Sequence, residues 1–274
     1  MSVNITDVVE TLVLPLYLRA REAQRRAAII QDEKSTEAVR QLDYDFTWID
    51  QLPGVMSSQV AMAIRTEIFD DVARGFLQRH PAGTIVNLGA GLCTRFYRLA
   101  NEQAHWVELD FEPVIEMRRR LFPDTPRHVS LACSVLDFAW MERVKQFRPE
   151  DGPILFIAEG VLYYLELTDV KQLLLATRQH FTPSELVFDA VGPVMIKSIN
   201  RGPLSKRFNT IVHWGVRDFR EVEQWCSGLR FLESWSYLDR HTKRWGMMKL
   251  IKWIPPLKQQ LWRIAHFRFD GETT

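Results

Sequence analysis

A glycine turn follows an apolar run in "TIVNLGAGLCTRFYRLA" and precedes a helical stretch. Gly89 and Gly91 let a ligand approach the backbone closely, because neither carries a side chain. Asp110 ends the next apolar run, 19 residues after Gly91, and a carboxylate at that spacing is placed to accept hydrogen bonds from ribose hydroxyls. Thr94 stands where a dinucleotide fingerprint would have its third glycine, so the pattern favours an adenosine-containing ligand without a pyrophosphate. The simpler alternative is a turn that only closes a strand–helix corner.

A second polar group ends the apolar run "PILFIA", where Glu159-Gly160 is followed by Tyr163 and Tyr164. In a parallel sheet this end of a strand faces the ligand crevice. A carboxylate there can bind an amine, and the tyrosine rings can attract a sulfonium or ammonium centre. The alternative is an acid at a helix N-terminus with the tyrosines in the core.

Other polar residues carry a weaker signal. Ser134 follows the third expected strand, and Arg19 and Arg65 lie on expected helices among apolar neighbours. His213 is the one histidine within a segment rich in Gly, Pro and basic residues, where it is a candidate acid, base or hydrogen-bond donor, although a structural role has more weight. Candidates to neutralise an acidic substrate in the same segment are Arg201, Lys206, Arg207 and His213.

The elements that must position these residues change in type near residue 80. Residues 1–80 show helical spacing, with Ser57 and Ser58 as expected caps. Short β-rich runs then alternate with helical stretches, which predicts an α/β fold with a mainly parallel sheet covered on both faces by helices. The last two expected strands are 230–238 and 245–253, and residues 192–220 resemble an insertion over a sheet edge.

Composition excludes several classes of function. The chain has 274 residues, 35 Lys+Arg against 34 Asp+Glu, and a net charge of +1, which gives no bulk electrostatic reason to bind nucleic acid. The apolar run 12–18 contains Pro15 and ends at Arg19, too soon to span a membrane. Cys93, Cys133 and Cys226 show no metal-site or disulfide spacing, so we expect no metal, reduced thiols and a cytoplasmic location.

Ordered motifs along nearly the whole chain resemble the leucine carboxyl methyltransferase family, within it the bacterial S-adenosylmethionine-dependent O-methyltransferases of polyketide biosynthesis. These motifs are "PLYLRARE", "IRTEIFDD", "VNLGAGLCTRFYRL", "WVELDFEPVIEMRR", "CSVLDFAWMERV", "LFIAEGVLYYL", "ELVFDAVGP" and "HWGVRDFREVEQW". The resemblance implies a class I methyltransferase (Rossmann-like) fold, with a doubly wound seven-stranded sheet whose final strand is antiparallel. It implies an N-terminal helical cap at 1–80, a methyltransferase domain at 81–274 and a substrate-covering insertion at 192–220.

The resemblance also assigns roles to single residues. Gly89 and Gly91 would lie beneath S-adenosyl-L-methionine, Asp110 would bind its ribose, and Ser134 to Val135 would flank its adenine. Glu159 would be an acid on the cofactor or substrate side. The family's arginines that match this chain are Arg65 and Arg19, expected to reach the methionine carboxylate, and Arg95 after the glycine turn. This chain has "LCTR" where the family usually has "LDTR", so Cys93 removes any polar role of that aspartate.

The expected reaction is methyl transfer by in-line displacement, which requires alignment of an acceptor oxygen and exclusion of water. It would release S-adenosyl-L-homocysteine. A carboxylate acceptor is already ionised at neutral pH, whereas a phenol would gain from a base. No base is evident, which favours a carboxylate of a small, polyketide-like molecule; Tyr163, Arg201, Arg207 and His213 are the substrate-side candidates. Alternatives are methylation of a protein C-terminus, a nicotinamide-dependent oxidoreductase and a non-catalytic adenosyl-ligand sensor.

Overall fold

A mixed β-sheet forms the centre of the computed structural model, which describes residues 5–99, 101–150, 152–254 and 258–271, with the backbone alone for 5–10, 247–249 and 251–253. Within these ranges seven strands form one sheet, in the order β3-β2-β1-β4-β5-β7-β6. The strands are β1 Thr84–Leu88, β2 His105–Asp110, β3 His128–Ala132, β4 Ile154–Ala158, β5 Ser184–Ala190, β6 Leu229–Ser236 and β7 Arg263–Phe269. The first five pair in parallel, and β7 runs antiparallel to β5 and β6. The expected class I methyltransferase sheet is confirmed.

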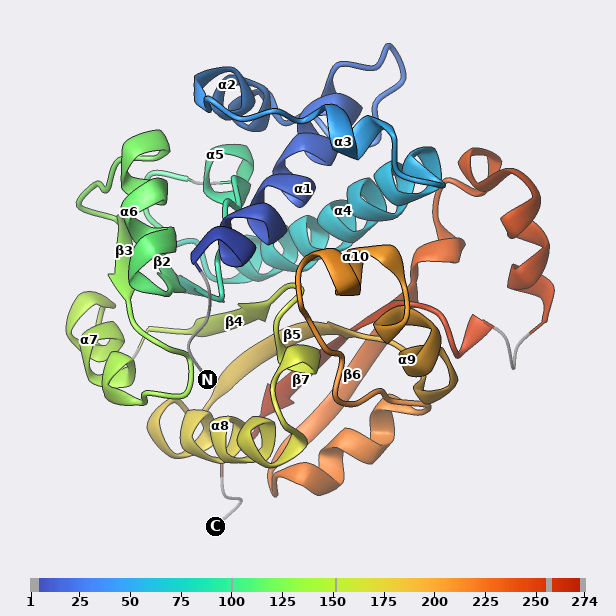
Figure 1. Cartoon of the computed structure of the whole chain (residues 1–274). Helices are drawn as coiled ribbons and strands as arrows, with labels where there is room; N and C mark the ends of the chain where they lie inside the picture. The colour runs from blue at the N-terminus through green and yellow to red at the C-terminus, as the bar shows by residue number, and fades with distance from the viewer. Residues whose placement is uncertain (1–4, 100, 151, 255–257, 272–274) are drawn as a thin grey trace.

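Helices cover both faces of the sheet, and Figure 1 shows α4 on the opposite side of it from α8. The central strands are buried throughout because alternate side chains enter two different cores. One core joins the sheet to α4, and its strand residues are Ile85, Trp106, Leu155, Ile157, Val187 and Ile264. The other joins it to α7 and α8, and its strand residues include Val86, Val107, Phe156, Leu186 and Phe188.

The α-helices divide into a group before the sheet and a group within its connections. Those before it are α1 Ile5–Ala23, α2 Glu33–Gln41, α3 Thr47–Asp50 and α4 Val55–Arg79. Those within it are α5 Arg95–Leu99, α6 Glu112–Leu121, α7 Ala139–Phe147, α8 Leu167–His180, α9 Pro193–Asn200 and α10 Pro203–Arg207. Short 3₁₀ segments are η1 Leu162–Tyr164, η2 Phe219–Trp225, η3 Tyr237–Asp239 and η4 Thr242–Trp253. The caps expected at Ser57 and Ser58 are wrong, since Gly54 precedes the first residue of α4.

The strand expected at 245–253 is also wrong. This apolar run lies in η4, which bends at Gly246 with φ of 55°. The seventh strand is instead β7, in the sequence "RIAHFRF". The segment 192–220 lies between β5 and β6 and contains α9, α10 and a stretch without regular structure.

A helix that crosses a membrane must be both long and apolar, and no helix in the described ranges combines the two properties.

Candidate functional site

The glycine turn lies at the point where the strand order reverses. Since β1 has β2 on one side and β4 on the other, the carboxyl ends of β1 and β4 border the crevice in which doubly wound sheets bind ligands. Gly89 and Gly91 follow β1 with φ of 67° and 50°, and Gly160 follows β4 with φ of 74°. These are left-handed backbone conformations that glycine adopts without strain. A Cβ at Gly89 would lie 2.5 Å from Cγ2 of Val161, so the turn also needs glycine for space.

Asp110 ends β2 directly beside this turn. Its carboxylate accepts hydrogen bonds from the backbone N–H of Gly91 at 2.7 Å and of Phe111 at 2.8 Å. Burial raises the pKa of Asp110, and the two N–H donors act against that effect. Two carboxylate oxygens offer about four acceptor positions. The remaining positions are open to a hydrogen-bond donor in the cavity described below, which Asp110 also lines.

Glu108 and Arg118 support the turn from beneath. Arg118 donates from Nη1 to the carbonyl oxygens of Gly91 at 2.8 Å and Cys93 at 3.0 Å. Its Nη2 lies 3.5 Å from Glu108, which is fully buried. Burial alone would raise the pKa of Glu108, but Arg118 and hydrogen bonds from His128 and Asn87 hold it at about 2. An ionised Glu108 thus fixes Arg118, and Arg118 fixes the turn.

Glu159, at the carboxyl end of β4, is clamped by two arginines. Its Oε1 lies 2.9 Å from Nε of Arg65, and its Oε2 lies 2.5 Å from Nη2 of Arg95. Burial opposes ionisation, yet these two cations hold the pKa of Glu159 at about 2. Glu159 is therefore a fixed anion at neutral pH and has no tendency to take up a proton.

A buried network of ion pairs connects the N-terminal helices to this clamp. Arg95 also contacts Asp70 of α4 at 2.8 Å, and Arg98 bridges Asp70 at 2.6 Å and Asp32 at 2.8 Å. Asp32, which caps α2, lies 3.2 Å from Nε of Arg19. Nη2 of Arg19 donates to the carbonyl oxygen of Leu92 at 2.7 Å. Arg19 therefore joins α1 and α2 to the loop that contains the glycine turn.

One cavity of about 840 Å³ lies over these groups, a size typical of small-molecule and cofactor sites. Its walls include every residue for which a cofactor role was expected, namely Arg19, Arg65, Gly89, Gly91, Arg95, Asp110, Ser134, Val135 and Glu159. The roles themselves stay predictions. Phe111 also lines the cavity and is 48% exposed, so its ring is available to a base. Sequence reasoning missed Phe111, although its place directly after the strand-ending Asp110 is a usable signal.

A second part of the cavity wall is apolar and aromatic. Tyr163 and Tyr164 follow β4, and Trp262 precedes β7, with its ring 4.8 Å from that of Tyr163. The segment 192–220 contributes Ile199, Gly202, Pro203, Leu204, Ser205, Phe208 and Thr210. Of the described lining residues, none is a histidine or lysine. Apart from Tyr163 and Tyr164, sequence reasoning singled out none of these residues, because most of them are apolar types equally typical of a core.

Three substrate-side candidates lie elsewhere. His213 is on the surface, with Nδ1 2.9 Å from Glu166, and Arg201 is exposed at the end of α9. The guanidinium of Arg207 lies 3.9 Å from the ring centre of Trp48 in α3. The cavity wall includes none of the three, nor Lys206. Arg207 instead ties α10 to the N-terminal helices.

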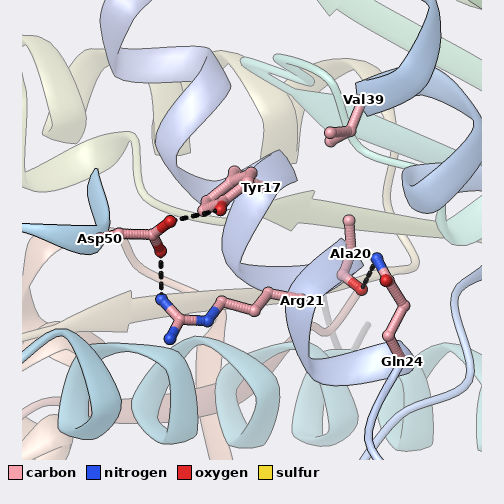
Figure 2. A pocket seen from close by; sticks show the side chains of 6 residues that line it. All are labelled: Tyr17, Ala20, Arg21, Gln24, Val39 and Asp50. Atoms are coloured by element: carbon pink, nitrogen blue, oxygen red, sulfur yellow. Dashed lines mark hydrogen bonds and ion pairs between the residues drawn. The ribbon is translucent and has the colours of Figure 1, made fainter. Parts of the chain in front are cut away.

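A smaller hollow of about 330 Å³ lies at α1, α2 and α3 (Figure 2). Its polar groups bind one another: Asp50 accepts from the Tyr17 hydroxyl at 2.9 Å and from Arg21, and Gln24 donates to the carbonyl of Ala20 at 3.2 Å. Because these side chains are paired across an open surface, the hollow adds nothing to the site.

Comparison with known proteins gives a family. A model of the family described as "Leucine carboxyl methyltransferase" matches residues 13–177, which include the glycine turn, Asp110 and Glu159. The chain is 30% identical over 239 residues to the tetracenomycin polyketide synthesis O-methyltransferase TcmP of Streptomyces glaucescens, covering 87% of this chain and 86% of that protein. It is 29% identical over 251 residues to the S-adenosyl-L-methionine-dependent methyltransferase dpfgK of Gibberella zeae, covering 85% and 83%.

A solved structure agrees with the fold. The chain is similar to a DUF574 family protein of Streptomyces avermitilis with a TM-score of 0.60, over 94% of this chain and 96% of that protein. The two sequences are 14% identical, so the likeness concerns the fold alone.

Proposed function

Because the chain belongs to the leucine carboxyl methyltransferase family and is therefore an S-adenosylmethionine-dependent methyltransferase, we propose that it methylates an oxygen atom of a small acceptor. The observation that carries the proposal is the composition of one cavity. Its wall combines the glycine turn and Asp110 with an apolar, aromatic region, around one cavity of about 840 Å³. The polyketide O-methyltransferase of Streptomyces glaucescens supports an oxygen acceptor, the Gibberella zeae relative supports the cofactor alone, and family membership removes the nicotinamide-dependent oxidoreductase.

The bound cofactor supplies an electrophilic methyl group on a sulfonium. We assign the ribose to Asp110, the adenine to Ser134, Val135 and Phe111, and the methionine carboxylate to Arg65, supported by Arg19. Apolar side chains over the acceptor exclude water, and helices 1–80 together with residues 192–220 form the proposed cover.

The acceptor is proposed to be a carboxylate, with a phenolic hydroxyl second. Glu159 is held ionised between Arg65 and Arg95 with a pKa of about 2, so it is a poor proton acceptor. Burial raises the pKa of Tyr163 and of Tyr164 above the ordinary value. Neither tyrosine is then suited to act as a phenolate base, and an acceptor that is already ionised needs none.

Methyl transfer from labelled cofactor to a panel of aromatic acids, phenols and peptides with a free C-terminal carboxylate, leucine included, tests the proposal. Alkali releases methanol from a methyl ester and leaves an aryl ether intact, so one treatment separates the two oxygen acceptors. Alkali-labile product on the small acids is expected. Transfer to peptides alone would favour the protein C-terminus, and cofactor binding without transfer to any class would favour a sensor.

A further inference from the structure

Asp189, near the end of β5, is a buried carboxylate for which neither the sequence motifs nor the proposed reaction has a role. Its side chain is fully buried. It accepts a hydrogen bond from the backbone N–H of Gly160 at 2.7 Å and from the hydroxyl of Tyr237 at 3.3 Å. Its Oδ2 lies 3.7 Å from Nη1 of Arg65. Asp189 therefore touches both the turn after β4 and an arginine of the cavity wall.

Arg65 lies between two carboxylates that act on different nitrogens. Nε donates to Glu159 at 2.9 Å, and Nη1 faces Asp189 without reaching hydrogen-bond distance. A guanidinium has five N–H donors in a fixed plane. Within the described part of the chain, Nε is the only nitrogen of Arg65 that donates a hydrogen bond. Glu159 and Asp189 therefore orient the guanidinium plane, while its terminal N–H groups stay available to an anion in the cavity.

We infer that Asp189, oriented by Tyr237, is a positioning residue that holds Arg65 in the orientation in which it binds a ligand carboxylate. The inference rests on the proposed function, which gives Arg65 the methionine carboxylate of the cofactor. Without the charge of Asp189, Glu159 is the remaining anion at Arg65. Glu159 is also bound by Arg95 at 2.5 Å. The guanidinium of Arg65 is then attracted toward Glu159 alone, and the orientation of its plane is no longer fixed.

The charged and titratable groups facing Asp189 come from four elements or their ends. They are Arg65 of α4, Glu159 after β4, Tyr163 and Tyr164 of η1, and Tyr237 of η3. Arg65 is the one cation among them, which makes it the natural partner of the Asp189 charge. Burial raises the pKa of Asp189 to about 6, so its charge is retained at neutral pH and its loss can be followed in a mild acidic range.

The test compares two probes by calorimetry: S-adenosylhomocysteine, which carries the amino-acid carboxylate, and 5′-methylthioadenosine, which lacks it. D189N keeps the shape of the side chain and an oxygen for the Gly160 N–H but removes the charge. We expect it to weaken S-adenosylhomocysteine five- to twentyfold and to leave methylthioadenosine within about twofold. Y237F should give a smaller change of the same kind. D71N, which removes an exposed carboxylate of the same helix as Arg65, is the matched control and should change neither affinity.

A double-mutant cycle with R65Q completes the test. If Asp189 acts through Arg65, D189N should have little further effect once Arg65 is replaced. Equal weakening of both probes would mean a general structural role, and unchanged binding of both would mean no role; either result overturns the inference. Should R65Q leave S-adenosylhomocysteine affinity intact, the carboxylate site at Arg65 and this inference fail together. The titration needs no methyl acceptor, so its result does not depend on whether an oxygen substrate is found.

Discussion

Leu12 of α1 lies directly over Gly91 of the glycine turn, and a Cβ on that glycine would come within 3.0 Å of Leu12 Cδ2. The contact brings the first helix of the described chain onto the loop that follows β1. Both residues line the large cavity. The N-terminal helix therefore forms part of the proposed cofactor site as well as part of its cover.

The contact between Leu12 and Gly91 predicts that alanine at position 91 is unfavourable, whereas alanine at Gly75 is not. G91A places a side chain at φ of 50° and against Leu12, so we expect it to lower the free energy of unfolding by about 1–2 kcal/mol and to weaken S-adenosylhomocysteine. G75A is the matched control. A Cβ there would lie 3.7 Å from Arg79, an ordinary contact within α4, and should stabilise by about 0.5–1 kcal/mol. Denaturant unfolding and calorimetry check both, and an unaltered affinity of G91A would contradict the close fit.

Asp110→Asn tests the proposed ribose ligand. The asparagine amide keeps one acceptor oxygen but lacks the negative charge of the carboxylate, which accepts hydrogen bonds from the Gly91 and Phe111 N–H groups. Since hydrogen bonds to a charged group contribute about 1.5–3 kcal/mol, the affinity for S-adenosylmethionine should fall about 10- to 100-fold. Calorimetric titration measures it, with 2′-deoxy and ordinary adenosyl ligands compared. A loss that is the same for both ligands would argue against contact with the 2′-hydroxyl.

Cys93→Asp introduces the aspartate that the family resemblance leads us to expect at this position. Cys93 lines the cavity, and its Sγ lies 3.5 Å from Nη1 of Arg95. An added carboxylate should favour the cationic sulfonium of S-adenosylmethionine over neutral S-adenosylhomocysteine, by about 1 kcal/mol or roughly fivefold. The ratio of the two dissociation constants is the measurement. A ratio equal to that of the wild type would mean that position 93 does not face the sulfur.

Ionisation of Asp189 should lower the stability of the fold and raise its selectivity for S-adenosylhomocysteine as the pH increases. Its pKa is raised to about 6 in the fold, above the ordinary value of 3.8, so the neutral form is favoured by folding. Stability from this group is present at low pH and is lost as the pH rises through about 6. Selectivity for S-adenosylhomocysteine over methylthioadenosine should rise over the same interval, as the charge beside Arg65 appears. Unfolding and binding measured from pH 5 to 7.5 should show both trends, and D189N should show neither; parallel trends in the variant would assign them to another group.

Three surface substitutions should have little effect on turnover. R201A and H213A alter exposed side chains outside the cavity wall, and His213 pairs with the exposed Glu166. We expect kcat/KM within about twofold of the wild type, since such surface pairs contribute little. R207A also removes the contact with Trp48, which is worth about 0.5–1 kcal/mol of stability. A tenfold loss of kcat/KM in any of these variants would indicate that the replaced residue contacts the substrate.

Sequence reasoning identified what is local and strongly patterned. The glycine turn, Asp110 and Glu159 each lie at the carboxyl end of an apolar strand, so their convergence follows from strand direction alone. It misassigned residues 245–253 because a short apolar run is compatible with a strand or a helical segment. The distinction depends on pairing, and β7 is the segment that bonds to both β5 and β6.

Contacts between residues far apart in the sequence could not be predicted from the sequence pattern. Nothing near Arg65 in the sequence indicates Asp189, which lies on another element and meets it only after β5 and α4 pack together. The same applies to Arg207, whose basic character suggested an acidic ligand although its guanidinium lies over the ring of Trp48.

The large cavity has walls from both ends of the described chain, with Leu12 and Arg19 on one side of the sequence and Trp262 on the other. During synthesis the ribosome releases Leu12 and Arg19 long before Trp262. The nascent protein therefore has no complete cavity until residue 262 has emerged and β7 has paired, so the apolar wall proposed for the acceptor is completed after the residues proposed for the cofactor.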